Sequence, residues 1–248
     1  MMAALMTFAT SLSQADTLSL TTVHRGWYRG DGLNDPANPN YVTGVLGSSS
    51  NDPRYHSFFV FDLTQVTNLI VSAELQLQNP IFGYYTDDSS EILGIFDVTT
   101  PLSSLTNGTG GTAAFNDLGS GVFYGAVTVD DSMNWGYTIP IELNASGLAA
   151  FNAARGGMIA VGGAVVTLDG HIDEYVFSRS DGSCYTGVIL QTVPNSALPD
   201  LQVSMVGSPE AVSVGELLSY QLALTNAGNL TASAVVLQST LSSNASVF

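Results

Sequence analysis

The chain has 248 residues, of which 45% are apolar and only 10% are charged, whereas about 25% are charged in an average soluble domain. Its formal net charge is −16, because 21 Asp and Glu face five Arg and no Lys. Nucleic acids and anionic lipids need basic side chains for binding, so this composition argues against both partners. The length allows one large domain or two smaller ones, with a core that needs no disulfide or metal.

The N-terminus is typical of an export signal. Residues 1–15 contain a short apolar run, too short to cross a bilayer, and end in Ser13-Gln14-Ala15, which has the small residues of a cleavage site. We therefore expect a signal peptide over residues 1–15 and a protein exported to the cell surface or the extracellular space. No later segment reaches the length of a membrane-spanning helix.

Short β-branched and aromatic runs then alternate with turn residues as far as Val193, which predicts an all-β domain over residues 16–193. A unit with this many strands is typical of a two-sheet, jelly-roll-like β-sandwich. The residues from Val71 to Gln78 alternate apolar and polar side chains, as in a strand with one wet face. The expected strands are Thr17–His24, His56–Phe61, Ile70–Leu77, Ile92–Val98, Val122–Val129, Tyr137–Glu142, Met158–Val166, Glu174–Phe177 and Gly187–Thr192.

Two short helices are expected between these strands. In Thr100–Leu105, Thr100 is a suitable N-cap and Pro101 suits the first helical position. In Asn144–Gly156, Asn144 is a suitable N-cap and Gly156 a suitable left-handed stop. Both helices are expected to cover an end of the sandwich.

A linker with two prolines, residues 194–199, precedes a second β pattern over residues 200–248. The expected strands there are Leu201–Met205, Leu217–Thr225 and Ala234–Gln238. An independent sandwich of the immunoglobulin kind needs about seven strands, so we expect this to be a truncated repeat from a longer protein.

Five short segments of residues 16–193 carry a resemblance to known proteins: Arg25–Tyr28, Asn40–Gly44, Phe58–Leu63, Phe96–Thr100 and Phe115–Gly121. With them, residues 16–193 resemble exported bacterial proteins of the PEP-CTERM-associated type. The resemblance implies export and an association with the cell surface and the extracellular polysaccharide matrix. The sorting tag itself is absent.

Residues 212–228 resemble the first half of the immunoglobulin-like repeat of bacterial surface proteins and adhesins. Gly215 suits a turn, and Tyr220, Leu222 and Leu224 alternate as on one face of a strand. The resemblance implies a spacer that holds another domain away from the cell.

The segment Asp31–Asn40 is the first candidate for a binding site. Its Asp and Asn oxygens are hard ligands of the kind Ca²⁺ prefers, although no Glu closes an EF-hand pattern. The candidate calcium ligands are Asp31, Asn34, Asp35 and Asn40. A plain structured loop is the alternative, because Asp and Asn are also ordinary turn residues.

Three aromatic residues, Trp27, Tyr28 and Tyr41, flank this loop. Together they could form a platform on which a sugar ring stacks, which would make the domain a carbohydrate-binding module. Burial in the core is the alternative.

The segment Asp169–Glu174 places His171 among carboxylates, as in an acid–base pair or a metal site, but a solvated turn has the same composition. Cys184 is the only cysteine, so no intrachain disulfide forms. No motif of a hydrolase, metalloprotease or nucleotide-binding protein occurs, and no catalytic residue or cofactor other than candidate calcium is assigned.

The sequence therefore predicts a non-enzymatic protein of the cell surface or extracellular matrix, structural or adhesive. Its expected partners are extracellular polysaccharide or other surface proteins. A carbohydrate-binding module is the first alternative, and a secreted hydrolase that uses carboxylates is the lower alternative.

Overall fold

The computed structural model describes residues 15–47, 53–170, 172–195, 200–208, 213, 215–216, 219–228, 232 and 235–236. One compact unit comprises Ala15–Val193, and the residues from Pro194 onward belong to another. The predicted signal peptide lies almost wholly outside the described residues. None of the helices described is long and apolar enough to cross a membrane.

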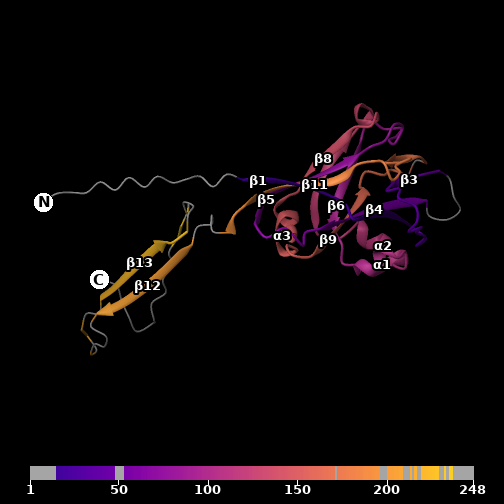
Figure 1. The fold of residues 1–248 in the computed structure, drawn as a ribbon. Coiled ribbons are helices and arrows are strands. Elements are labelled where there is room, and N and C mark those ends of the chain that lie inside the picture. Colours follow the sequence, from indigo (N-terminus) through magenta and orange to yellow (C-terminus); the bar gives the residue numbers. More distant parts are fainter. Residues whose placement is uncertain are drawn as a thin grey trace. The chain divides into compact units, whose positions relative to one another are not determined.

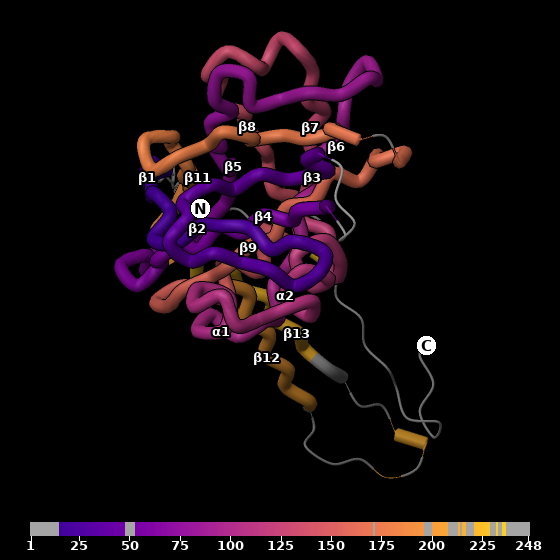
Figure 2. Tube along the Cα trace, turned by 90° about the vertical axis from the view of Figure 1, so that its right-hand side faces the viewer, coloured from indigo at the N-terminus to yellow at the C-terminus, as the bar shows by residue number. Residues whose placement is uncertain are grey.

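The unit Ala15–Val193 is a sandwich of two antiparallel sheets (Figures 1 and 2). The smaller sheet has the order β1 (Asp16–Thr21), β11 (Thr186–Val193), β5 (Leu69–Gln78) and β8 (Thr138–Glu142). The larger sheet has the order β10 (Glu174–Val176), β3 (Thr43–Val45), β4 (Arg54–Asp62), β9 (Met158–Val165), β6 (Glu91–Asp97) and β7 (Phe123–Val129), and β2 (His24–Arg29) pairs with β4. The prediction of an all-β sandwich with short helices is confirmed.

The main core takes its side chains from both sheets. Phe59 and Phe61 of β4, Leu75 of β5, Ile95 of β6 and Val188 of β11 all belong to it and are fully buried. On β5 the neighbouring side chains are half-buried or exposed, whereas on β4 the alternate residues Phe58 and Val60 are buried on the opposite face of the sheet.

The expected strand Thr17–His24 is two strands in the structure. The chain leaves β1 in the smaller sheet and enters β2 in the larger one, and the crossing is held by bonds from Thr22 N–H to the Thr186 carbonyl (3.1 Å) and from Val23 N–H to the Val60 carbonyl (2.8 Å). The sequence gives no sign of this crossing, because β-branched residues continue through it. The three-residue strand β3 was not expected either.

A β-bulge in β5 breaks the expected alternation at its start. Gln191 pairs with Ser72, but the next residue, Thr192, pairs with Ile70, so Val71 is the extra residue. Ile70 is buried and Val71 is 43% exposed. A bulge reverses the facing of the residues beyond it, because side chains otherwise alternate strictly.

The described part of the chain contains three α-helices rather than the two expected. Two of them, α1 (Leu102–Thr106) and α2 (Gly111–Leu118), contribute Leu105, Ala114, Phe115 and Leu118 to a second buried cluster with Tyr28 and Phe58. They cover the outer face of the larger sheet (Figure 2). Thr100 does not cap α1, because its hydroxyl donates to the Asp117 carboxylate and Pro101 is the N-cap.

The third helix, α3 (Ala145–Ala153), begins as predicted. The Asn144 side chain accepts bonds from the N–H groups of Ser146 (2.9 Å) and Gly147 (3.1 Å). Gly156 has φ +78°, the left-handed conformation expected after the helix. Phe151 is buried in the main core, and α3 packs on β5 and β7.

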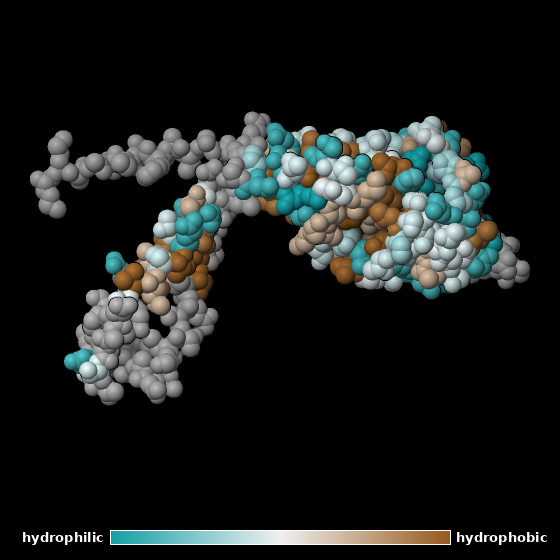
Figure 3. Space-filling model, turned by 60° about the horizontal axis from the view of Figure 1, so that its bottom comes forward, coloured by the Kyte–Doolittle hydropathy of each residue, from teal (hydrophilic) through white to brown (hydrophobic). Residues whose placement is uncertain are grey.

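The other unit contains one described antiparallel hairpin, β12 (Leu201–Ser208) and β13 (Ser219–Asn226). Its described apolar side chains are exposed, among them Val203, Met205, Val206, Leu222 and Leu224, and apolar atoms are visible along it in Figure 3. The expected strand Ala234–Gln238 lies mostly outside the described residues.

Candidate functional site

The three aromatic residues predicted to form a sugar platform are buried. Trp27 is 7% exposed, and Tyr28 and Tyr41 are fully buried. Stacking on a sugar requires an accessible ring face, so this prediction is wrong. The side chains also lie apart, since Tyr28 belongs to the cluster under α1 and α2 and Tyr41 to the main core.

Hydrogen bonds within the protein satisfy the hydroxyls of the two buried tyrosines. The Tyr28 hydroxyl donates to the Ser104 carbonyl (2.9 Å) and accepts from Gly110 N–H (3.2 Å), which ties the α1–α2 connection to β2. The Tyr41 hydroxyl donates to the Gln78 carbonyl at 2.6 Å. Both phenols therefore satisfy their polar atoms inside the protein, as buried tyrosines usually do.

The candidate calcium ligands are engaged in local hydrogen bonds. Asp31 forms an ion pair with Arg29 at 2.5 Å, and the Asp35 carboxylate accepts from Ala37 N–H at 3.0 Å. The Asn34 side chain donates to the Trp27 carbonyl, and the side-chain oxygen of Asn40 accepts from Val42 N–H at 2.6 Å. These are the bonds of a structured loop, and calcium binding here stays a prediction.

A different group of carboxylates comes together in the structure. Oxygens of Asp88, Asp169 and Glu174, the acidic cluster, lie within 4.8 Å of one another. Asp88 comes from the β5–β6 connection, Asp169 follows β9, and Glu174 begins β10. The sequence places Asp169 and Glu174 in one motif, but it does not bring Asp88 to them. His171 of that motif lies outside the described residues.

The environment of the acidic cluster favours a bound proton. Burial, followed by the hydrogen bond to Asp169 and repulsion from it, raises the pKa of Glu174 to about 7. Glu91, also fully buried, adds further repulsion. Such a cluster can hold a proton or a hard cation. Because Glu174 is fully buried, it does not reach a substrate from solution.

Trp135 and Phe82 are the two most exposed aromatic side chains among the described residues, and their rings contact one another. We call this pair, with the exposed residues Ile81 and Tyr137 that stand beside it in the sequence, the aromatic tip. Trp135 is 68% exposed and Phe82 is 52% exposed. Their ring centroids are 5.1 Å apart at an interplanar angle of 61°, an edge-to-face contact.

Hydrogen bonds join the two loops that carry the tip. Phe82 N–H donates to the Asn134 carbonyl (3.2 Å), and Tyr84 N–H donates to the Asn134 side chain (3.0 Å). The Asn79 side chain donates to the Met133 carbonyl (3.0 Å), and the backbone N–H of Asn79 donates to the Tyr137 carbonyl (2.7 Å). The exposed rings are therefore held in place by backbone on both sides.

The backbone of Phe82 is itself unusual. Its φ is +60°, a conformation that costs a residue with a side chain about 1–2 kcal/mol. Strained residues persist where the surrounding bonds hold them, and they concentrate at functional sites. In this conformation the Phe82 ring lies against Trp135.

The sequence analysis did not single out the aromatic tip. One signal was available, since Trp135 stands between Asn134 and Gly136, and Phe82 follows Asn79-Pro80-Ile81 and precedes Gly83. A large aromatic residue inside a run of turn residues is expected at the surface. The proximity of the two loops could not be inferred from their positions in the chain.

Comparisons with known proteins do not assign the chain to a family. No family model matches it, and no curated protein matches it significantly. The aromatic tip and the acidic cluster are two candidate sites that follow from its own structure.

Proposed function

We propose that this protein is an exported, non-enzymatic surface or matrix protein whose sandwich domain adheres to extracellular polysaccharide through the aromatic tip. The observation that carries the proposal is the exposed, edge-to-face pair of Phe82 and Trp135. It replaces the buried rings of Trp27, Tyr28 and Tyr41 as the surface for sugar stacking.

The chemistry of the tip suits a sugar. The negative face of an indole ring attracts the weakly positive C–H groups on one side of a pyranose ring. Phe82 supports Trp135 from the side, so little conformational freedom is lost when a sugar binds. Preorganisation of this kind favours binding.

The charge of the protein supports polysaccharide over an anionic membrane as the partner. The chain carries a formal charge of −16 and no Lys, and Asp130 and Asp131 stand close to the tip in sequence. This surface repels anionic headgroups. It does not repel a neutral, hydroxyl-rich polymer.

Export and surface location rest on the sequence. The N-terminal pattern of residues 1–15 and the resemblance to PEP-CTERM-associated proteins and to surface repeats support them. The buried position of Glu174 supports a structural role for the acidic cluster over the hydrolase alternative.

Affinity electrophoresis in gels containing neutral or acidic polysaccharides tests the proposal. We expect at least one polymer to retard the protein and Trp135→Ala to abolish the retardation. Phe123→Ala is the matched control, because Phe123 is also an exposed aromatic in an edge-to-face pair, with Phe96. The proposal fails if no polymer retards the protein, or if both variants behave alike.

A further inference from the structure

A second surface feature, distinct from the aromatic tip, is an open cavity of about 500 Å³. This volume lies within the range of roughly 300–1,000 Å³ found for small-molecule sites. Its walls are the β1–β2 corner with Arg25, the loop that carries Pro36 and Pro39, and the segment from Gly182 to Thr186. We call it the Arg25 cavity.

The charge of the Arg25 cavity is opposite to that of the protein. The chain has 21 acidic residues, yet no Asp or Glu among the described residues lines the cavity, and its ionisable lining includes Arg25 and His24. The nearby Asp181 carboxylate, which is not part of the lining, accepts from the N–H and hydroxyl of Ser183 at 2.8 and 2.6 Å. The positive charge of Arg25 is therefore the feature of the lining that suits an anion.

Neutral groups hold the guanidinium of Arg25 in place. One terminal nitrogen donates to the Cys184 carbonyl (2.5 Å) and the Thr186 hydroxyl (2.9 Å), and the other donates to the Asp181 carbonyl (2.6 Å). A guanidinium has five N–H donors, so within the described part of the chain two of them have no assigned acceptor. No carboxylate there forms an ion pair with Arg25.

We propose that the Arg25 cavity binds an acidic sugar unit, a monosaccharide ring that carries one carboxylate. The free donors of Arg25 would bind the carboxylate, as guanidinium groups commonly do. Hydroxyls and the imidazole of His24 would face the sugar hydroxyls, and the rings of Pro36 and Pro39 offer an apolar wall to the C–H side of the ring. The proposal uses residues other than those of the aromatic tip and does not depend on the proposed function.

Cys184 provides a direct reporter. It lines the cavity, is partly exposed, and is the only cysteine in the chain, so the rate of its reaction with a thiol reagent reports occupancy. We expect D-glucuronate to slow the reaction about two-fold when its concentration equals its Kd. At the same concentration and ionic strength, D-glucose and acetate should have little effect. If glucose protects Cys184 as well as glucuronate does, the carboxylate plays no part in binding. If acetate protects it equally well, the sugar ring plays no part. Either result overturns the proposal, and so does a failure of glucuronate to protect Cys184.

Two matched substitutions locate the effect. Arg25→Gln should abolish the protection, whereas Arg179→Gln, which removes one exposed positive charge elsewhere, should retain it. Because Arg25 also supports the segment Asp181–Thr186, thermal melting must show that its variant is folded. Ala37→Trp adds a large ring at an exposed position of the cavity wall and should also abolish protection without disturbing those bonds. Protection that survives both Arg25→Gln and Ala37→Trp would place the ligand elsewhere and overturn the assignment.

Discussion

The guanidinium carbon of Arg25 lies 4.9 Å from the centre of the Tyr41 ring. Tyr41 is fully buried and its hydroxyl donates to the Gln78 carbonyl at 2.6 Å. The ring predicted to stack on a sugar is instead the surface on which an arginine is held, and a cation over an aromatic face is stabilised by the ring quadrupole. A candidate ligand-binding residue therefore supports the Arg25 cavity from within the core.

The aromatic tip should show the cost of its strained backbone. Phe82→Gly and Phe82→Ala both remove the ring, but only Gly adopts φ +60° without steric cost. We expect the Gly variant to be more stable than the Ala variant by about 1 kcal/mol. Chemical denaturation measures the difference, and an Ala variant at least as stable as the Gly variant would show that Phe82 is not strained.

The acidic cluster predicts a pH-dependent stability. Burial and Asp169 raise the pKa of Glu174 to about 7, above its value in the unfolded chain. The folded state therefore binds the proton more tightly, and stability falls as the pH rises from about 4.5 to 7. Glu174→Gln cannot ionise, so at pH 8 it should be more stable than the natural protein, by on the order of 1–3 kcal/mol.

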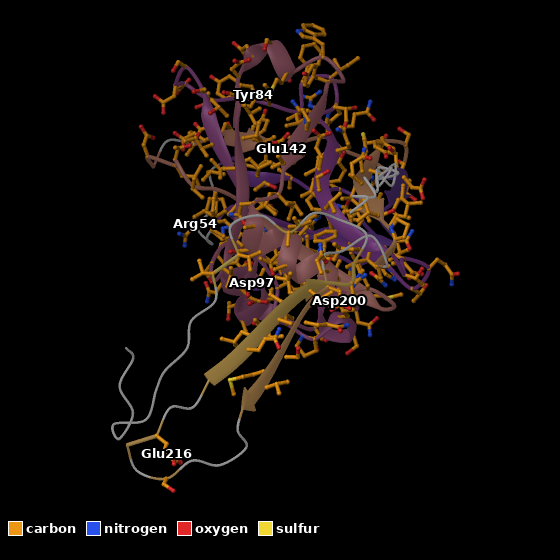
Figure 4. All side chains as sticks on the ribbon, turned by 90° about the vertical axis from the view of Figure 1, so that its left-hand side faces the viewer. Arg54, Tyr84, Asp97, Glu142, Asp200 and Glu216 are labelled. Carbon is orange, nitrogen blue, oxygen red and sulfur yellow. The ribbon has the colours of Figure 1, made fainter. Side chains whose placement is uncertain are left out.

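Thermal melting across that pH range tests this prediction. The advantage of Glu174→Gln should vanish near pH 4. Glu142→Gln is the control, because Glu142 lies exposed on β8 (Figure 4). Parallel stability curves for Glu174→Gln and the natural protein would contradict the raised pKa.

The packing of α2 on β9 depends on a missing side chain. A Cβ at Gly162 would lie 2.7 Å from the Cα of Leu118 and closer still to its carbonyl oxygen. Since backbone cannot move aside cheaply, Gly162→Ala should destabilise the sandwich by about 1–3 kcal/mol. At Gly157 the nearest atom would be 3.5 Å away, so Gly157→Ala should shift stability by no more than about 0.5 kcal/mol. Similar denaturation midpoints for the two variants would exclude this close approach.

The hairpin β12–β13 should be less protected than the sandwich. An isolated two-stranded hairpin is at best marginally stable in water, and the described apolar side chains of this one are exposed. We expect limited proteolysis of the 248-residue chain to remove the segment after Pro194 and leave a stable fragment of residues 16–193. A chain ending at Val193 should melt at the same temperature as the longer one. Equal protection of both regions in monomeric protein would contradict this division.

Local chemistry in the sequence was enough to predict most of the sandwich. Strands such as β4, β5 and β9 have β-branched and aromatic side chains, and their propensity acts within the segment itself. The start of α3 was predictable for the same reason, because the Asn144 side chain caps N–H groups only two and three residues away. The helix α2 was not expected, because its short glycine-led sequence carries no capping signal and its stability comes from burying Phe115 and Leu118 against the larger sheet.

The fold class, the acidic character and the positions of most strands were predictable, because they follow from composition and short-range periodicity. Which aromatic rings are accessible depends instead on how the two sheets pack. The tertiary structure buries Trp27, Tyr28 and Tyr41, exposes Trp135, and turns Val71 outward at a bulge set by its pairing with β11. It also brings Phe82 to Trp135, Arg25 to Cys184 and Asp88 to Glu174. These contacts join residues far apart in the chain, and they depend on the order and register of strands in two sheets, which no local pattern specifies.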